Sequence, residues 1–419
     1  MSSVTLPRRS ALAPVLIAWL FVVFDGYDLI VYGTVQATLR AEWSMGAAEA
    51  GTIGSLAFLG MMVGALVVGR ISDSIGRKRA ILASAIVLSV FTTACALVHA
   101  PWLFGLLRFL AGLGLGGLVP SANALAADLI PRRWRGAVAT LMMSGVPLGG
   151  SAAALIGLGV IDRWGWRPMF AFALIPLLIL VPVAIRVLPD DRPRSRPVVH
   201  QEHAAGFLTL LRPPFLAISV LFAVATVVTL TAWYGLGTWL PNLMQEAGYD
   251  LGSALLFALA LNLGAIAGSI ITAWAGDRFG TVQTGAVAAG LAGGALLLLL
   301  TGPSVGMVYL ILVLAGIGTH GTQCLIIAAI STYFPDNLRG TALGWGLGIG
   351  RIGAVAAPQV GGWLLAAGLG VNSNFLLFGG CALLACLVLI VIATRFRARY
   401  DDPAPTVPVA VPATVAPRP

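Results

Sequence analysis

Charged residues are scarce in this chain of 419 residues: Asp, Glu, Lys and Arg together make up 10% of it, whereas hydrophobic residues make up 58%. About a quarter of the residues in a soluble globular domain are charged. The composition therefore excludes an ordinary soluble protein and indicates one that lies in a lipid bilayer. Cysteine is also scarce. Its four copies lie in apolar stretches without the spacing of a disulfide framework or a metal site: Cys95, Cys324, Cys381 and Cys386.

Sequence signatures of catalysis are also missing. We find no metal cluster, nucleophile elbow or phosphate-binding loop, so we do not expect an enzyme or a bound metal. The net charge is +9, but the basic residues lie in short clusters between apolar runs. This distribution favours an orientation signal over a nucleic-acid surface, and no nucleic-acid partner is expected.

A cleaved signal peptide is not indicated either. Arg8 and Arg9 precede an apolar run, as in a signal peptide, but the run continues past Val31, contains two acids and lacks a clear cleavage site. We interpret it as the first membrane span.

Long apolar runs are what the chain has in abundance. A helix needs roughly 20 apolar residues to cross a bilayer, and twelve segments meet this length. They are approximately 14–38, 50–69, 80–99, 101–127, 137–161, 168–188, 215–240, 252–275, 282–301, 306–333, 340–367 and 373–394. The predicted fold class is an all-α membrane protein with twelve transmembrane helices.

The distribution of Lys and Arg predicts the orientation. Of the 25 basic residues, 20 lie in the two terminal segments and in the loops on the same side, 3 lie in the opposite loops, and Arg108 and Arg351 lie within spans. By the positive-inside rule, both termini are cytoplasmic. We expect a multi-pass protein of the bacterial inner (cytoplasmic) membrane.

The two halves of the chain repeat each other at a shift of 204 residues, the difference between 237 and 33. The matching segments are Gly33-Thr34 with Gly237-Thr238, Asp73-x-x-Gly76 with Asp277-x-x-Gly280, Leu110–Gly117 with Leu314–Gly321, and Pro131-x-x-x-Arg135-Gly136 with Pro335-x-x-x-Arg339-Gly340. We therefore predict two six-helix bundles, 1–188 and 213–396. A cytoplasmic linker, 189–212, joins them, and a disordered cytoplasmic tail, 397–419, follows.

A glycine-rich basic loop links spans two and three. Gly69 and Gly76 permit a tight turn, Asp73 can accept hydrogen bonds from a helix N-terminus in the other half, and Arg77 can pair with Asp128 at the inner end of span four. Such contacts would hold an inner gate shut; the alternative is a basic loop that only keeps the hairpin cytoplasmic. The segment resembles the signature loop of the major facilitator superfamily. Its second copy contains Asp277 and Arg278, and Thr281 stands where a basic residue is expected.

Span one carries two acids, Asp25 and Asp28, three residues apart and therefore on one helix face. An unpaired charge at mid-bilayer costs about 3 kcal/mol, so we expect both acids to face a polar cavity, where a carboxyl can take up and release a proton. The alternative is a structural ion pair with a membrane arginine. Asp28 lies at a similar depth to Arg108 of span four, and the two can form an ion pair. That pair can serve the structure, proton coupling or both.

These segments resemble the aromatic acid:proton symporter family of the same superfamily. The resemblance is carried by Asp25-Gly-Tyr-Asp28, by Arg108–Gly117 and by Gly344–Pro358. The sequence departs from the family pattern at Asp128, where many relatives have Glu. It implies two pseudo-symmetric bundles and proton-coupled uptake of a small aromatic carboxylate, such as a benzoate or hydroxybenzoate. The proton gradient supplies the energy, without a cofactor, and Asp25, Asp28 and Arg108 carry the coupling.

Arg351 is the candidate anchor for the substrate carboxylate, because it lies near the middle of span eleven and a guanidinium binds a carboxylate through two hydrogen bonds. Its alternative is a permanent pair with an acid. Gln323 and His320 in span ten are further candidates, His320 as a proton relay or as a packing residue. The candidate walls for an aromatic ring are Tyr27, Phe58, Trp233 and Tyr234.

Two other functions fit the same fold. A drug:proton antiporter would favour an acidic, aromatic cavity, which Arg351 argues against. A sensor of aromatic acids that does not transport them would need a signalling surface, which the short linker and featureless tail do not offer. We expect the protein to act as a monomer.

Overall fold

The computed structural model describes residues 8–131, 134–190 and 207–396; the side chains of residues 8–10, 69–74 and 336 are outside this description. Helices dominate the described part. The first half contains α1 (Arg8–Trp43), α2 (Ala47–Ile75), α3 (Arg77–Cys95), α4 (Pro101–Leu129), α5 (Arg135–Trp164), α6 (Arg167–Ala171), η2 (Pro176–Leu180) and α7 (Val181–Val187). The second half contains α9 (Leu216–Glu246), α10 (Leu251–Phe279), α11 (Thr281–Leu298), η3 (Leu299–Thr301), α12 (Val305–Tyr333), α13 (Asp336–Ala366) and α14 (Gly370–Arg395).

Eleven segments of the described chain are long and apolar enough to cross a membrane. The sixth span is a composite of α6, η2 and α7, interrupted where Pro176 and Pro182 remove backbone donors. The one expected span outside these eleven segments is span eleven, which is α13. Its 31 residues are sufficient to cross a bilayer, but its many glycines and Arg351 reduce its apolarity. The described chain is a multi-pass, all-α membrane protein, as the sequence predicted.

Two glycines at equivalent positions of the repeat end helices in the same way. Gly76, between α2 and α3, has φ 91°, and Gly280, between α10 and α11, has φ 93°. Both values lie in the region that glycine adopts without steric cost. The tight turn predicted at Gly76 is therefore present, and it recurs in the second half.

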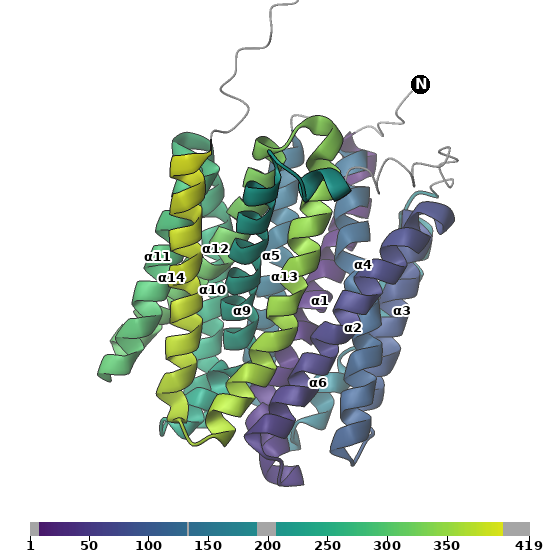
Figure 1. Cartoon of the computed structure of the whole chain (residues 1–419). Coiled ribbons are helices and arrows are strands. Elements are labelled where there is room, and N and C mark those ends of the chain that lie inside the picture. Colours follow the sequence, from purple (N-terminus) through teal and green to yellow (C-terminus); the bar gives the residue numbers. More distant parts are fainter. Residues whose placement is uncertain (1–7, 132–133, 191–206, 397–419) are drawn as a thin grey trace, which may run out of the picture.

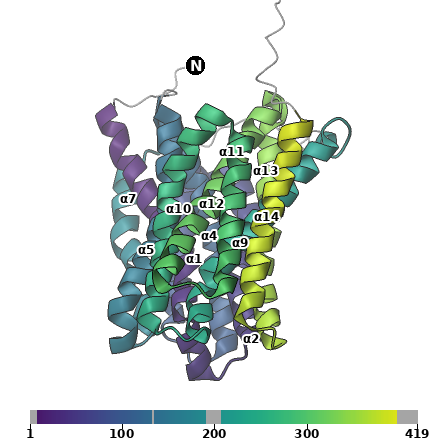
Figure 2. The same cartoon turned by 90° about the vertical axis from the view of Figure 1, so that its left-hand side faces the viewer.

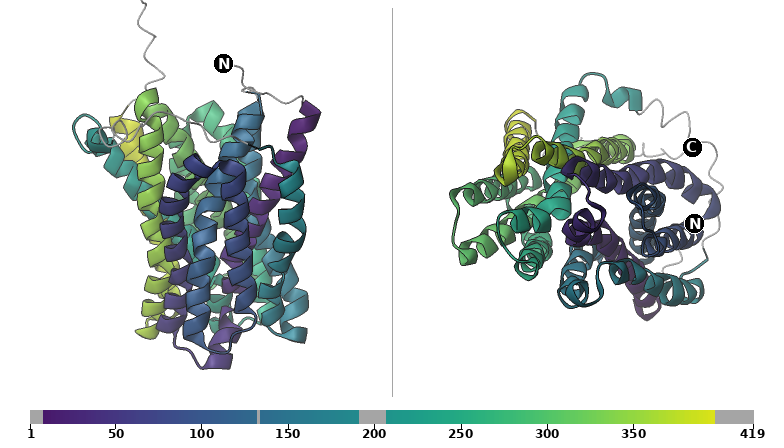
Figure 3. Two further views of the ribbon diagram at one scale, coloured as in Figure 1. Left: turned by 90° about the vertical axis from the view of Figure 1, so that its right-hand side faces the viewer. Right: turned by 90° about the horizontal axis from the view of Figure 1, so that it is seen from below.

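The repeat extends to the helix packing. In the first half α2 and α3 pack on α4, and α1 packs on α5; in the second half α10 and α11 pack on α12, and α9 packs on α13. Figure 1 places α3 at one flank and α11 and α14 at the other, and Figure 2 shows α10, α12 and α14 of the second half with α5 and α7 of the first half beside them. Viewed along the bundle, the two sets of helices lie side by side (Figure 3).

The halves meet along three helix pairs: α2 with α13, α5 with α10, and α1 with α9. We call the end of the bundle where α1 begins and α14 ends the terminal end, and the opposite end, with the α1–α2 turn, the loop end (Figure 1). Near the loop end the backbones almost touch. A Cβ atom added at Gly33 would lie 2.2 Å from the Gly237 oxygen, and one added at Gly51 would lie 2.6 Å from the Pro358 oxygen.

The same interface loosens toward the terminal end. Beyond the contact between Met61 and Arg351, the α13 glycines Gly344 and Gly348 have no atom within 4 Å of an added Cβ. Leu66 and Val67 of α2 are also exposed there. At the loop end, Arg40 of α1 pairs with Glu246 of α9 at 2.6 Å and donates to Asn242. The halves are thus tightly joined at the loop end, whereas α2 and α13 diverge toward the terminal end (Figure 1).

The predicted linker and tail lie largely outside the described residues. Of the linker 189–212, residues 191–206 lie outside the described part, and so does the whole tail 397–419. The domain boundaries remain predictions.

Candidate functional site

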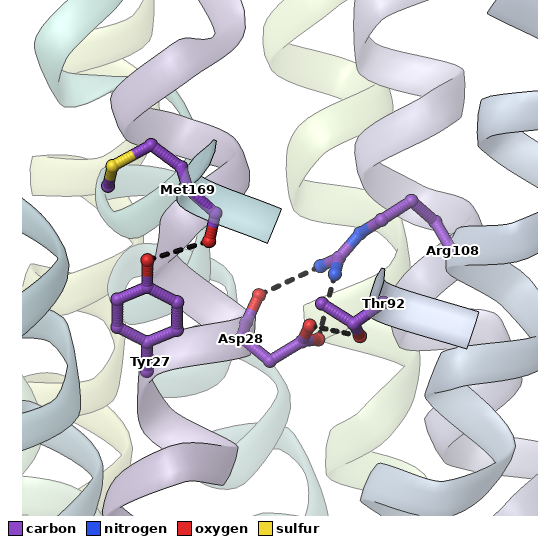
Figure 4. Close-up of polar contacts among 5 residues, drawn as sticks. All are labelled: Tyr27, Asp28, Thr92, Arg108 and Met169. Atoms are coloured by element: carbon purple, nitrogen blue, oxygen red, sulfur yellow. Dashed lines mark hydrogen bonds and ion pairs between the residues drawn. The ribbon is translucent and has the colours of Figure 1, made fainter. Parts of the chain in front are cut away.

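Asp28 is held by a network drawn in Figure 4. The Arg108 guanidinium donates to Asp28 Oδ2 at 2.8 Å and to the Asp28 backbone oxygen at 2.9 Å. The Thr92 hydroxyl of α3 donates to Asp28 Oδ1 at 2.6 Å. All three side chains are buried. The ion pair that the sequence suggested is present, and each carboxylate oxygen of Asp28 has a donor.

Asp25, one turn earlier on α1, has different surroundings. It is 1% exposed, and its Oδ1 atom has no hydrogen-bond partner. It interacts electrostatically with Arg351 of α13 and with Tyr234 of α9. A carboxyl without a full set of donors, facing a cation from the other half, is suited to exchange a proton or respond to a ligand.

Arg351 lies in the middle of α13 and reaches across to the first half. Its Nη1 atom contacts the Met61 sulfur of α2 at 2.8 Å, and it interacts with the Tyr234 side chain. It takes part in none of the ion pairs found among the described residues. A guanidinium that meets a thioether in place of a carboxylate can accept an anionic ligand.

Aromatic side chains flank this cation. Phe58 of α2 and Tyr234 of α9 lie with ring centroids 4.7 Å apart, one from each half. We define the central cluster as Asp25, Phe58, Met61, Tyr234 and Arg351, which come from four helices and both halves. A planar acid placed here would meet an aromatic surface and a cation together.

His320 and Gln323 lie beside each other on α12. The His320 ring packs on Trp233 at 5.0 Å, and its Nε2 atom lies 3.3 Å from the Met143 backbone oxygen of α5. Since a carbonyl only accepts, Nε2 is the protonated nitrogen in this contact. The buried Gln323 Oε1 atom has no donor, so Gln323 can accept a hydrogen bond from a ligand.

Tyr27 is not brought to the central cluster. Its hydroxyl donates to the Met169 backbone oxygen at 2.7 Å (Figure 4), and its ring packs in a separate apolar cluster with Trp166 and Phe170 near the loop end. On the described geometry Tyr27 supports the first half and does not form a wall beside Arg351.

The segment predicted as a basic loop lies almost wholly in helices, since α2 continues to Ile75 and α3 begins at Arg77, and its basic residues form two ion pairs. Arg77 pairs with Asp128 of α4, as the sequence suggested, and Lys78 pairs with Asp190 at 2.8 Å. The hydrogen bond from Lys78 lowers the pKa of the exposed Asp190 carboxyl. Gly69 and Asp73 lie in α2 with their side chains outside the described part.

The second copy of the loop differs from the first. Asp277 and Arg278 are exposed, and neither belongs to an ion pair among the described residues. Arg278 instead lies over the Phe279 ring, 5.7 Å from its centroid. The two copies therefore share a backbone turn and not a set of side-chain contacts.

Sequence analysis did not identify Thr92 or Met61 as site residues. Threonine and methionine are common in apolar helices, and nothing in their spacing marks them. Helical phase places Thr92 on the α4 side of α3, but only the packing of α1 brings Asp28 to it. Met61 lies on the same face of α2 as Phe58, one turn away. This spacing from a predicted site residue is the sequence feature that could have identified Met61.

Comparison with known protein families identifies the class of protein. The model of the Major Facilitator Superfamily matches residues 18–358, with a second match over 259–417. The chain belongs to the Major Facilitator Superfamily. This major facilitator is accordingly a membrane transporter and not an enzyme.

Curated relatives of this major facilitator are named as carriers of aromatic acids. A gentisate transporter of Corynebacterium glutamicum is 60% identical, over 93% of this chain and 89% of the relative. A benzoate transport protein of Acinetobacter baylyi is 34% identical over 94% and 92%. A 4-hydroxybenzoate transporter of Pseudomonas aeruginosa is 28% identical over 86% and 87%. The major facilitator therefore belongs with the aromatic acid transporters of its superfamily.

Solved structures agree with the fold. The crystal structure of a D-xylose–proton symporter superposes with a TM-score of 0.71 at 16% identity, over 90% of this chain and 96% of that one. A bacterial homologue of the lysosomal transporter Spinster, in an inward-facing conformation, gives a TM-score of 0.69 at 17% identity, over 93% and 96%. At these identities the likeness supports the major facilitator fold alone.

Proposed function

We propose that this protein takes up a small aromatic carboxylate of the hydroxybenzoate class, such as gentisate, together with protons by alternating access. The observation that carries the proposal is Arg351, a cation at mid-bilayer depth that meets a thioether and an aromatic ring but no carboxylate within ion-pair distance among the described residues. An unpaired charge is costly at this depth, so an anionic ligand that pairs with it gains affinity. The name of the 60%-identical relative supports gentisate as the first substrate to test.

In the proposal, the central cluster and two residues of α12 together supply the groups that a hydroxybenzoate requires. Arg351 offers two parallel donors to the carboxylate, Phe58 and Tyr234 offer ring faces, and Gln323 offers an acceptor for a ring hydroxyl. His320 lies on the same helix face as Gln323 and contributes to that side of the ligand, while Trp233 holds the His320 ring. Because these groups come from both halves, bound substrate would favour states that bring the halves together.

Coupling requires that the proton and the substrate influence each other. Asp25 lies within electrostatic reach of Arg351, so the charge of one alters the binding of a ligand or proton at the other. In the proposal, Asp25 takes up a proton, and the Asp28–Arg108 pair opens and closes with the cycle. The proton gradient is the only energy source, and no cofactor is involved.

Gating is assigned to the two ends of the bundle. We place the terminal end on the cytoplasmic side of a bacterial inner membrane, in agreement with the distribution of Lys and Arg. There Asp73, Arg77, Asp128 and Asp277, at helix ends of both halves, would latch the gate in the opposite state of the cycle. The separation between α2 and α13 at this end matches the release of substrate to the cytoplasm.

The test is counterflow of labelled gentisate in proteoliposomes. Arg351→Ala should raise the substrate KM about a hundredfold or more, because two charge-assisted hydrogen bonds are lost. Arg351→Lys should recover only part of the affinity, since an ammonium does not bind both oxygens in parallel. Arg163→Ala, which removes an exposed arginine at the loop end, is the matched control and should be neutral.

Other outcomes identify the rival functions. Unchanged gentisate transport in Arg351→Ala would refute the anchor. Proton-driven efflux of a cationic dye without counterflow of any aromatic acid would indicate a drug:proton antiporter. Gentisate binding in a thermal-shift assay, with neither counterflow nor uptake, would indicate a sensor.

A further inference from the structure

The helix α3 begins at the predicted gating residue Arg77, carries none of the residues predicted to bind substrate or protons, and lies at the flank of the bundle (Figure 1). Its Thr92 is nevertheless fully buried, and its hydroxyl donates to Asp28 Oδ1 at 2.6 Å. Most other described threonine hydroxyls donate to a backbone oxygen of their own helix, as Thr226 and Thr319 do; this is the usual arrangement for a hydroxyl in a membrane helix. Thr92 instead bonds a charged side chain of another helix.

The two donors to Asp28 bond different oxygen atoms of its carboxylate. Thr92 occupies Oδ1, and Arg108 occupies Oδ2 and the backbone oxygen of the same residue. Figure 4 shows the Thr92 hydroxyl and the Arg108 guanidinium converging on Asp28 from different helices. Attraction in a buried ion pair offsets its desolvation only if the geometry is good and the remaining lone pairs are bonded. Thr92 supplies that remaining bond.

A hydroxyl is also suited to a partner whose charge changes. It donates to an ionised carboxylate and can accept from a protonated one by rotating about the C–O bond. A methyl group of the same size does neither. Threonine therefore keeps Asp28 oriented whether Arg108 is bonded to it or not.

We propose that Thr92 is a positioning residue of the transport cycle, whose hydroxyl orients the Asp28 carboxylate for pairing with Arg108. The proposal rests on the function proposed above. Thr92 is not among the residues of the central cluster, and it acts through Asp28. Loss of its hydroxyl should slow the cycle without weakening substrate binding.

The experiment compares Thr92→Val, Thr92→Ser and Thr93→Val in proteoliposomes, with gradient-driven uptake of labelled gentisate measured per folded protein. Thr93 is the matched control, because its hydroxyl is buried on the same helix without a hydrogen-bond partner. We expect Thr92→Val to lower Vmax roughly tenfold or more, as for loss of a hydrogen bond to a charged group, with KM within about twofold of wild type. Thr92→Ser should restore most of the rate, and Thr93→Val should match wild type.

Two results would overturn the proposal: equal rates in Thr92→Val and Thr93→Val, or a serine variant as slow as the valine variant. If Thr92→Val does not yield folded protein, Thr92→Ala compared with Thr92→Ser asks the same question, because only serine keeps the hydroxyl. Wild-type protein that does not carry gentisate or any other aromatic acid would refute the proposed function and this inference with it. Wild-type transport with an unaffected Thr92→Val variant would refute this inference alone.

Discussion

Asp25 and Asp28 lie one helical turn apart, yet their carboxylates are bonded differently. Both oxygens of Asp28 have donors, from Thr92 and Arg108, whereas Asp25 Oδ1 has none among the described residues. Asp28 is therefore part of a buried charge pair that the first half needs for its packing. In the proposed function, Asp25 is the acid that changes its protonation as Arg351 gains or loses an anionic partner.

The same substitution at the two acids should separate these roles. Asp25→Asn, which resembles a protonated carboxyl, should keep gentisate counterflow and lose at least about 90% of the stimulation by a pH gradient, since no proton is exchanged at this position. Asp28→Asn should lower stability by roughly 3 kcal/mol, because Arg108 is left buried without a compensating charge. Uptake with and without a gradient and thermal unfolding measure the two effects. Asp25→Asn protein that still responds fully to the gradient would exclude Asp25 as the carrier.

At the scale of helices, glycines decide where the halves can touch. Gly33 lets α1 approach α9 so closely that an added Cβ would lie 2.2 Å from a backbone oxygen, whereas Gly344 of α13 has open space around it. Two glycines in membrane helices thus have different tasks. One permits a close contact between the halves, and the other lies where the halves have separated.

Alanine substitutions should reveal this difference. Gly33→Ala should destabilise the described conformation by about 1–3 kcal/mol, because a backbone oxygen cannot move aside as a flexible side chain would. Gly344→Ala, the matched control, should be neutral or slightly stabilising, by up to about 1 kcal/mol. Thermal unfolding and counterflow rates of both variants provide the test. A Gly33→Ala protein as stable and active as wild type would mean that the contact between α1 and α9 is not required.

For the whole molecule, the two ends of the interface differ. The loop end is joined by Arg40–Glu246 and by close glycine contacts, and the terminal end is separated between α2 and α13. Alternating access requires this asymmetry to reverse during the cycle, so the Arg40–Glu246 pair must break when the loop end opens. Partly exposed ion pairs contribute about 0–1 kcal/mol, which is enough to bias the two states without trapping either.

Breaking the pair should therefore shift the balance of states. In a variant with the native cysteines replaced and Ala37→Cys added, Glu246→Gln should raise the rate of labelling by a membrane-impermeant maleimide up to about fivefold, as expected for about 1 kcal/mol. Glu42→Gln is the matched control, because Glu42 pairs with Arg167 at the same end but within one half. Exchange of the charges at positions 40 and 246 should restore the wild-type rate. Equal labelling in both Gln variants would show that the pair does not hold the loop end closed.

The sequence alone determined the membrane class, the spans and the residues that could do chemistry. These follow from local free energies: apolar runs of about 20 residues favour the bilayer, and charged residues inside it are costly enough to stand out. Asp25, Asp28, Arg108 and Arg351 could be named for that reason, and the turn at Gly76 followed from the need for a positive φ. The predicted span 340–367 corresponds to α13, which is less apolar than the others because glycine and arginine replace bulky apolar residues.

The tertiary structure alone decided which of these residues meet. Thr92 and Arg108 bond Asp28 from 64 and 80 residues away along the chain, and Arg351 contacts Met61 from 290 residues away. These contacts depend on how each helix is rotated and tilted against its neighbours. Tyr27 turned toward Met169 for the same reason, although its sequence position between two acids suggested a place at the site. Rotation and tilt are set by close packing over many contacts, each of which contributes little free energy. No local sequence pattern predicts their combined effect.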